Sequence, residues 1–302
     1  ELPPQIKKRM KKDIVTLDNL AKVYFEDKVE ENKANKKQEG RYNLHIKELL
    51  GSKDIHSITK EDVKKLQQHL LNKSKAPKTI NGITTLLRAI INYSIKEKDL
   101  KLVNPAVGVK NLKTDDKRER FLSLDEIKLL IENVKDNERL YHFVKMALST
   151  GARLESVLSI QKKDIDLEHE KITIKDLKNG STYTGFFSDE VYLNEVKEAI
   201  NNLKANDYYI GGNETKTPSR TIQRQLKPIL DELFNTDLDV RDAKNRVVIH
   251  TLRHTFASQL AIAGVPIFTI KNLMNHGDIE MTMRYAKLAP DSGSMAVRGL
   301  YG

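Results

Sequence analysis

The sequence predicts a mainly α-helical protein of two domains, with a small β-sheet or hairpin in the second. Apolar residues recur at helical spacing through most of the 302 residues, a length that suits two domains. A polar, non-periodic segment at residues 111–120 separates residues 1–110 from residues 121–302 and is interpreted as a linker. Two short β-like runs flank an Asn-Gly pair, which is typical of a hairpin.

The first domain is expected to be helical throughout. Its apolar stripes lie at residues 17–25, 63–71 and 80–95. Thr59 is a predicted N-cap, followed by acidic residues that favour a helix start. Pro77 suits the first turn of the longest helix, and Asn104-Pro105 ends the domain.

The second domain is expected to be mixed. Ser123 and Glu126 form a predicted capping box at its start. Strands are predicted at residues 171–175 and 181–187, with Asn179-Gly180 as a two-residue turn between them. Helices are predicted at residues 140–149, 153–160, 219–234, 251–263, 266–275 and 279–287.

The charge distribution is uneven. Residues 1–117 contain 26 Lys and Arg against 16 Asp and Glu, whereas residues 118–302 contain 26 of each. A basic first domain fits nucleic-acid binding through the phosphate backbone. A lysine-rich solvated surface explains the charge equally well, so charge alone leaves both interpretations open.

Features that the sequence lacks narrow the possible classes of function further. The chain has no cysteine, which excludes disulfides, thiolate metal sites and a cysteine nucleophile and fits a reducing, cytoplasmic compartment. No apolar run is long enough to span a bilayer, so no membrane partner is expected. The first residues, Glu1-Leu2-Pro3-Pro4, have no apolar signal core and no initiator Met, so a trimmed or processed start is expected.

Four short motifs in the second domain together indicate phosphodiester chemistry. They are Thr150-Gly-Ala-Arg153, His250-Thr-Leu-Arg253, His276-Gly277 and Tyr285. Arginine binds phosphate through two donors and keeps its charge, histidine transfers protons near neutrality, and a tyrosine hydroxyl can attack phosphorus when cations surround it.

Each motif alone has an ordinary structural explanation. Arg153 could be a surface arginine at a helix start, His250 a helix N-terminal residue, and Tyr285 one of ten tyrosines packed in a core. His276 could interact with a helix C-terminus, with Gly277 as the helix-end residue. His254 points away from Arg253 along the helix and is expected to be structural. Their order in one chain favours the catalytic interpretation.

Lys178 stands directly before the Asn-Gly turn. A lysine at a hairpin tip can reach into a groove and protonate a 5′ oxygen, although a solvated turn lysine is the plain alternative.

These motifs resemble the tyrosine recombinase, or phage-integrase-like, family in type and order. The stretches Leu-Met-Asn-His276-Gly and His250 to Ser258 carry the likeness in the second domain, and Thr79-Ile-Asn-Gly carries it in the first. The resemblance covers nearly the whole chain. It implies a helical DNA core-binding domain at 1–110 and a catalytic domain with a C-terminal tail at 121–302. No arm-binding domain is expected in front of them, so by this resemblance the chain looks most like Xer-type recombinases, in particular the single-protein XerH kind.

The resemblance also implies a mechanism. Tyr285 would attack the scissile phosphate and form a 3′-phosphotyrosyl bond, and Lys178 would protonate the departing 5′ hydroxyl. Arg153, Arg253 and His276 would stabilise the transition state, and His250 would assist proton transfer. No metal or other cofactor is implied. The expected partners are a double-stranded DNA recombination site and further copies of the chain, as a dimer on each site and a tetramer in synapsis, with a DNA translocase left open.

One position departs from the family pattern. An acidic residue usually follows the first arginine by three positions, where this chain has Ser156, and the acid Glu155 comes one residue early. Either the helix accommodates the shift or another residue has taken over the supporting role.

DNA contacts outside the motifs are predicted from charge and position alone. They are Lys75, Lys78 and Arg220, each near a predicted helix start. The tail is expected to dock on a neighbouring protomer through Met295, Val297 and Leu300.

The leading interpretation is a site-specific recombinase of the Xer type, acting in chromosome dimer resolution. The alternatives are an integrase or transposase of a mobile element, a type IB-like topoisomerase, a DNA-binding protein with a silent site, and a helical nucleic-acid-binding module without chemistry.

Overall fold

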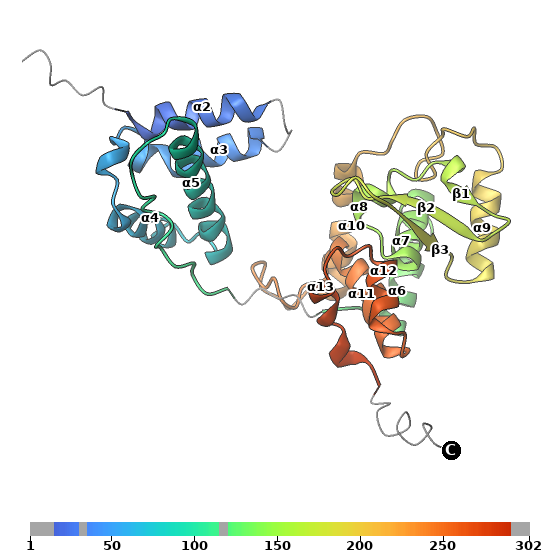
Figure 1. Cartoon of the computed structure of the whole chain (residues 1–302). Helices are drawn as coiled ribbons and strands as arrows, with labels where there is room; N and C mark the ends of the chain where they lie inside the picture. The colour runs from blue at the N-terminus through green and yellow to red at the C-terminus, as the bar shows by residue number, and fades with distance from the viewer. Residues whose placement is uncertain (1–14, 30–34, 115–119, 291–302) are drawn as a thin grey trace, which may run out of the picture. The chain divides into compact units, whose positions relative to one another are not determined.

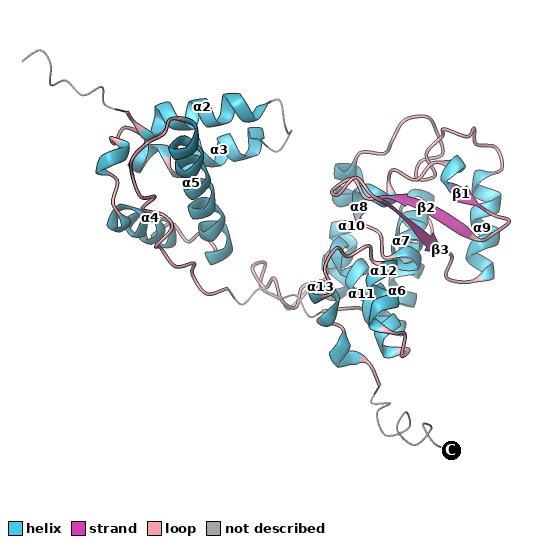
Figure 2. Ribbon diagram, in the orientation of Figure 1, coloured by secondary structure: helices cyan, strands magenta, loops and turns pink. Residues whose placement is uncertain are grey.

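The computed structural model describes residues 15–29, 35–114 and 120–290. The chain divides into two compact units, Glu1–Asp115 and Asp116–Gly302, and each is described by itself. Most described residues are helical, and the three strands of the described residues all lie in the second unit (Figure 2). This confirms the predicted fold class. The tail residues Met295, Val297 and Leu300 lie outside the described residues.

Helices build the first unit around one apolar core. They are α2 (Leu17–Val29), α3 (Asn35–His45), α4 (Lys60–Asn72) and α5 (Pro77–Glu97), with short η2 (Lys47–Gly51) and η3 (Ile55–Ser57) between α3 and α4. The predicted caps are confirmed: Thr59 and Asp62 form a capping box at α4, and Pro77 is the first residue of α5. The apolar stripe of α5 is buried against α2, α3 and α4.

The chain beyond α5 packs back along that helix. The side-chain amide of Asn81 donates to Leu112 O (2.9 Å) and its oxygen accepts from Leu112 N–H (2.8 Å). Arg88 donates to the carbonyl of Ala106. The Thr79-Ile-Asn-Gly motif thus has a structural role, because its asparagine fixes the segment that leads toward the second unit.

The second unit is larger and mixed. Its helices are α6 (Leu124–Val134), α7 (Glu138–Thr150), α8 (Leu154–Val157), α9 (Glu190–Ile200), α10 (Ser219–Phe234), α11 (Ile249–Ile262), α12 (Ile267–Leu273) and α13 (Glu280–Met283), with short η4 (Lys162–Asp164) and η5 (Ala286–Leu288). The capping box of Ser123 and Glu126 begins α6 as predicted. Helix α11 packs on α7 and α12, and α12 contacts α13; the labels of α11, α12 and α13 lie close together in Figure 1.

The sheet is antiparallel, with the order β1-β2-β3. Its strands are β1 (Ile165–Asp166), β2 (Lys171–Lys175) and β3 (Thr182–Phe186). Ile172 and Ile174 point from β2 into the core, opposite Gly185 and Tyr183. The alternation predicted the two longer strands, whereas β1 is too short to leave a periodic signal.

The predicted two-residue turn at Asn179-Gly180 is wrong. The last strand pair is Lys175 with Thr182, and Asp176 N–H donates to Ser181 O beyond it. Four residues therefore connect the ends, and Gly180 (φ +73°) carries the left-handed conformation. The connection has four residues rather than two because the backbone pairing ends at Asp176 and Ser181 and does not continue to Lys178.

Several helix predictions need correction. Helix α8 ends at Val157, short of the predicted residue 160. Helices α3 and α9 were not predicted. Gly277 is not the residue that ends α12: the left-handed position is Asn275 (φ +47°), and His276 N–H closes the turn on Lys271 O.

Candidate active site

The Thr-Gly-Ala-Arg motif lies where α7 ends. Gly151 is the left-handed C-cap of α7 (φ +62°), and its N–H donates to Ala147 O (3.0 Å). A Cβ at this position would lie 2.3 Å from the ring of Phe256, so the motif needs glycine for both conformation and space. The turn leaves Arg153 as the N-cap of α8.

Arg253 is buried in the middle of the site. Its guanidinium donates through Nη1 to Gly151 O (2.6 Å) and through Nη2 to Met274 O. Both carbonyls belong to C-caps of helices, where the macrodipole is negative and favours a cation. Burial, and next the charge of Arg153, lower the pKa of Arg253, which places the two arginines near each other.

Arg153 is held by a carboxylate from the sheet. Its Nη1 lies 2.5 Å from Oδ2 of Asp176, directly after β2, and the Asp176 side chain is buried while that of Arg153 is partly exposed. Only one of five guanidinium donors faces this oxygen in the contact described, so the group retains capacity to bind a phosphate.

Tyr285 contacts His254 rather than a motif residue. Nδ1 of His254 lies 2.7 Å from the tyrosine hydroxyl oxygen, and the His250 and His254 rings meet edge-to-face at 4.9 Å one helical turn apart. The Tyr285 ring packs in a small apolar cluster with Ile270 and Met274. Burial raises the pKa of Tyr285, and the nearby charges of Arg284 and Arg253 oppose that effect.

The expectation that His254 is merely structural missed this contact. The histidine does point away from Arg253, but it points toward the predicted nucleophile. The i, i+4 spacing of His250 and His254 was visible in the sequence. The position of Tyr285 against them was not.

His276 is buried beside the arginine pair. Its Nδ1 lies 2.8 Å from Oγ1 of Thr282. Burial, and then the positive charges of Arg253 and Arg153, lower its pKa to about 4. The imidazole is therefore neutral at pH 7, and with one ring nitrogen at Thr282 the other is available to a ligand.

Lys178 lies in the loop between β2 and β3 with an exposed side chain. Its backbone N–H donates to Oδ1 of Asp176 (3.0 Å). The loop base is thus connected to Arg153 through one carboxylate. The predicted DNA contacts are exposed: Lys75 precedes α5, Lys78 lies in its first turn, and Arg220 lies in the first turn of α10.

The structure shows what Glu155 and Ser156 contact and which residue supplies a carboxylate to Arg153. Glu155 forms an ion pair with Lys216 (2.7 Å), and that hydrogen bond is the main cause of its lowered pKa. Ser156 is buried in α8. The carboxylate at Arg153 comes instead from Asp176.

Tyr183 is a further residue that the motifs did not reveal. It lies on β3, and its hydroxyl oxygen is buried. Burial raises its pKa, while the charges of Arg253 and Arg153 act in the opposite direction, so it borders the arginine pair. A tyrosine in a strand gives no sequence signal for such a position.

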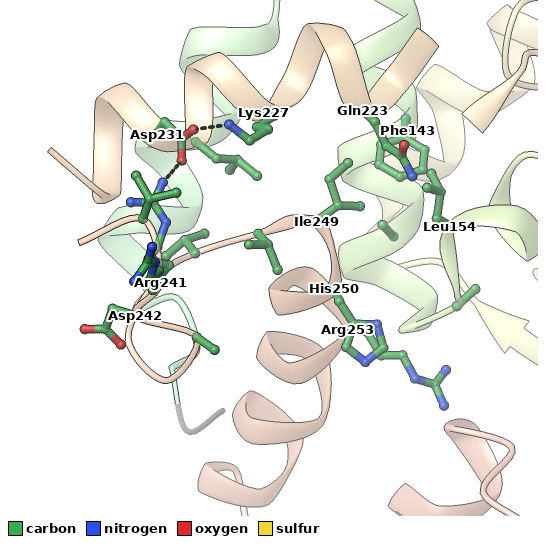
Figure 3. Close-up of a pocket in the computed structure, with 18 residues that line it drawn as sticks. Phe143, Leu154, Gln223, Lys227, Asp231, Arg241, Asp242, Ile249, His250 and Arg253 are labelled. Atoms are coloured by element: carbon green, nitrogen blue, oxygen red, sulfur yellow. Dashed lines mark hydrogen bonds and ion pairs between the residues drawn. The ribbon is translucent and has the colours of Figure 1, made fainter. Parts of the chain in front are cut away.

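A cavity of about 560 Å³ borders the site. Figure 3 shows His250 and Arg253 on α11 at one end of it, with Asp231 and Lys227 of α10 at the other. Asp231 pairs there with Lys227 and Arg246, and this pairing lowers its pKa. His250, which lines the cavity at the start of α11, is exposed.

The described residues contain no group of three or more His, Asp or Glu side chains arranged to hold a metal ion. None of the helices in the described ranges is long and apolar enough to cross a membrane.

The arginines, histidines and tyrosine lie within residues 120–291, and this whole segment matches a known sequence family. The chain belongs to the phage integrase family. It is thus a tyrosine recombinase, an enzyme that cuts and rejoins DNA strands, which confirms the resemblance identified from the motifs.

Relatives of the enzyme include both Xer tyrosine recombinases and integrases. The tyrosine recombinase XerA of Saccharolobus solfataricus is 29% identical over 258 residues, covering 83% of this chain and 82% of the relative. The ICEBs1 integrase of Bacillus subtilis is 28% identical over 306 residues, covering 92% of this chain and 80% of the relative.

Solved structures share the fold. The Tn1549 transposon integrase in complex with a circular intermediate DNA has a TM-score of 0.74 at 20% identity and covers 94% of this enzyme and 98% of its own chain. A lambda integrase dimer bound to a COC′ core site has a TM-score of 0.75 at 16% identity. The match covers 94% of this enzyme and 81% of the lambda integrase chain.

Proposed function

We propose that the enzyme is a site-specific recombinase that acts on double-stranded DNA through a 3′-phosphotyrosyl intermediate. The observation that carries this proposal is the convergence of Arg153, Arg253, His276 and Tyr285 around α11. Two cations that remain charged and a neutral imidazole donor suit the nonbridging oxygens of a phosphodiester.

In the proposed reaction, the oxygen of Tyr285 forms a bond to phosphorus while the bond to the 5′ oxygen breaks. The tyrosine proton leaves toward the histidines of α11, with His250 assisting the transfer. Lys178 gives a proton to the departing 5′ oxygen. The energy of the broken linkage is kept in the tyrosyl phosphodiester, so rejoining by the opposite attack needs no further energy source.

The basic first unit is proposed to bind the DNA backbone, with Lys75 and Lys78 as phosphate contacts and Arg220 as one from the second unit. Since the DNA is the substrate, cytoplasm is the proposed location. A dimer on each site and a tetramer in synapsis are proposed from the assemblies named for the lambda integrase structures.

A nicked suicide DNA substrate tests the chemistry. The wild-type enzyme should form a covalent protein–DNA adduct, and Tyr285→Phe should bind the same DNA without forming one. Tyr208→Phe, which changes another tyrosine of the same unit, is the matched control. An adduct that persists in Tyr285→Phe would contradict the proposal. Relaxation of supercoiled plasmid that lacks any specific site would indicate topoisomerase activity instead.

Within the family we propose an Xer-type role, the resolution of chromosome dimers by a single recombinase, in which a DNA translocase would be a regulator. The similarity to XerA supports it. The ICEBs1 integrase covers slightly more of the chain, which favours integration of a mobile element as the second candidate. Sequencing the DNA trapped on Tyr285 in host cells distinguishes them: a single chromosomal locus supports resolution, and the ends of an element support integration.

A further inference from the structure

The buried carboxylate of Asp176 joins three parts of the active site. We infer that Asp176 is a positioning residue: it orients Arg153 toward the phosphate and fixes the Lys178 loop and the His276 turn to that arginine. This inference rests on the catalytic roles proposed above.

The first contact is the ion pair with Arg153. One Asp176 oxygen lies 2.5 Å from Nη1, and the aspartate side chain is 1% exposed against 22% for the arginine. A carboxylate so buried loses its hydration, and only strong partners offset that cost. The pair therefore fixes the direction of the guanidinium, whose remaining donors stay available to a phosphate.

The second contact fixes the lysine loop. The other carboxylate oxygen of Asp176 accepts from the backbone N–H of Lys178 (3.0 Å), and Gly180 N–H donates to the Asp176 carbonyl (2.8 Å). Asp176 thus binds the loop that follows it through both its side chain and its backbone carbonyl. The position from which the Lys178 side chain extends is set by the carboxylate that binds Arg153.

The third contact reaches the histidine turn. Asn275 donates through Nδ2 to Asp176 Oδ2 (3.2 Å) and to Ser181 Oγ (3.0 Å). Asn275 has the left-handed backbone (φ +47°) that turns the chain from α12 to His276. A non-glycine residue in this conformation is strained and needs support, which the two hydrogen bonds supply.

Together these contacts connect segments that are far apart in the sequence. The pairs Arg153–Asp176 and Asp176–Asn275 span 23 and 99 residues. Removing the negative charge weakens the pairing with Arg153, and the single acceptor oxygen of an amide cannot keep the contacts to Arg153, the Lys178 loop and Asn275 together. Because misplacement by about 1 Å can cost ~10²-fold in rate, the expected effect is on the chemical step rather than on DNA affinity.

The test compares Asp176→Asn with wild type on the nicked suicide substrate. At saturating DNA, Asp176→Asn should form the covalent adduct about 10- to 100-fold more slowly, while its Kd for DNA stays within about twofold and Asp176→Glu retains more activity than Asp176→Asn. Asp164→Asn is the matched control. Asp164 is also buried next to the sheet and pairs with Lys175 (3.3 Å), and this variant should cleave at the wild-type rate.

A double-mutant comparison separates positioning from a general role in stability. On an Arg153→Ala background, Asp176→Asn should cause little further loss, because its main partner is already gone. Equal rates for Asp176→Asn and Asp164→Asn, or a full additional loss on the Arg153→Ala background, would overturn the inference. If Asp176→Asn does not fold, Asp176→Glu is measured in its place. Its longer side chain displaces the carboxylate from Arg153, so the adduct should form more slowly than in wild type, and an unchanged rate overturns the inference. Failure of the wild-type enzyme to form an adduct would instead refute the proposed function.

Discussion

The hydroxyl oxygen of Tyr285 lies 2.7 Å from Nδ1 of His254, a residue 31 positions earlier on α11. A buried phenol with a raised pKa does not ionise readily in water-free surroundings. The contact with the imidazole of His254 holds the hydroxyl in place, and Nδ1 can accept the phenolic proton in the tautomer that leaves this nitrogen without a hydrogen. His254 and His250 thus form a short path of rings that leads away from Tyr285, the proposed nucleophile.

The first prediction concerns this bond. His254→Phe should slow adduct formation by about 10²-fold at saturating DNA, because both the orienting bond and the proton acceptor are lost. His254→Gln, which can still accept a hydrogen bond, should lose less. The rate is measured on the nicked suicide substrate. His169→Phe, at an exposed turn histidine, is the control, and wild-type kinetics in His254→Phe would exclude the proposed role.

The second prediction concerns acid sensitivity. His276 has a pKa of about 4 in the folded protein against 6.5 ordinarily, so below pH 6.5 the unfolded chain binds a proton that the folded protein does not. Its contribution to stability is present above pH 6.5 and is lost as the pH falls through about 4. In urea unfolding, the unfolding free energy of the wild type should decrease as the pH falls from 6.5 to about 4. The unfolding free energy of His276→Gln should decrease less over the same range.

The exposed His56 supplies the comparison for that experiment. His56→Gln should keep the wild-type dependence of the unfolding free energy on pH. Identical slopes for His276→Gln and wild type between pH 6.5 and 4 would contradict the assignment.

The third prediction concerns the glycine before the first arginine. Gly151→Ala should lower the free energy of unfolding by about 2 kcal/mol or more, since it adds left-handed strain and a clash with Phe256. Gly40→Ala should have the opposite sign, a gain of about 0.5–1 kcal/mol, because Gly40 lies inside α3 with open space around it. Urea denaturation measures both. If Gly151→Ala left the free energy of unfolding unchanged, the turn would have to rearrange to accept the side chain.

The fourth prediction tests the general acid. Lys178→Ala should slow cleavage of ordinary DNA by about 10²-fold or more, because the 5′ oxygen leaves without a proton. A substrate with sulfur in place of that oxygen should restore the rate, since a thiolate leaves unprotonated. Lys171→Ala, also exposed and on β2, should behave as wild type on both substrates. If sulfur does not rescue Lys178→Ala, another residue is the acid.

Features set by neighbours in sequence were predictable. The capping box of Ser123 and Glu126 and the start of α5 at Pro77 depend on residues within one turn. Helix α9 had comparable signals, because Asp189 caps it and Tyr192, Val196 and Ile200 repeat every four residues. These local signals are sufficient to mark a helix at residues 190–200.

Other features have no local signal. In α3, Tyr42 is buried while Leu44 is 69% exposed, so no apolar stripe marks that helix. The partners of Asp176 and of His254 come from segments brought near only by the folded core. The motifs therefore identified the side chains suited to the chemistry, whereas the groups that orient them required the structure.

The guanidinium of Arg253 is bound by two backbone carbonyls, from the ends of α7 and α12. Neither carbonyl is in position until both helices have folded against α11. A chain that has partly unfolded therefore keeps Tyr285, the proposed nucleophile, but no assembled site in which to use it. For an enzyme that cuts DNA strands, such a dependence limits cleavage to the folded protein: a copy that has lost this packing would not cut the DNA it meets.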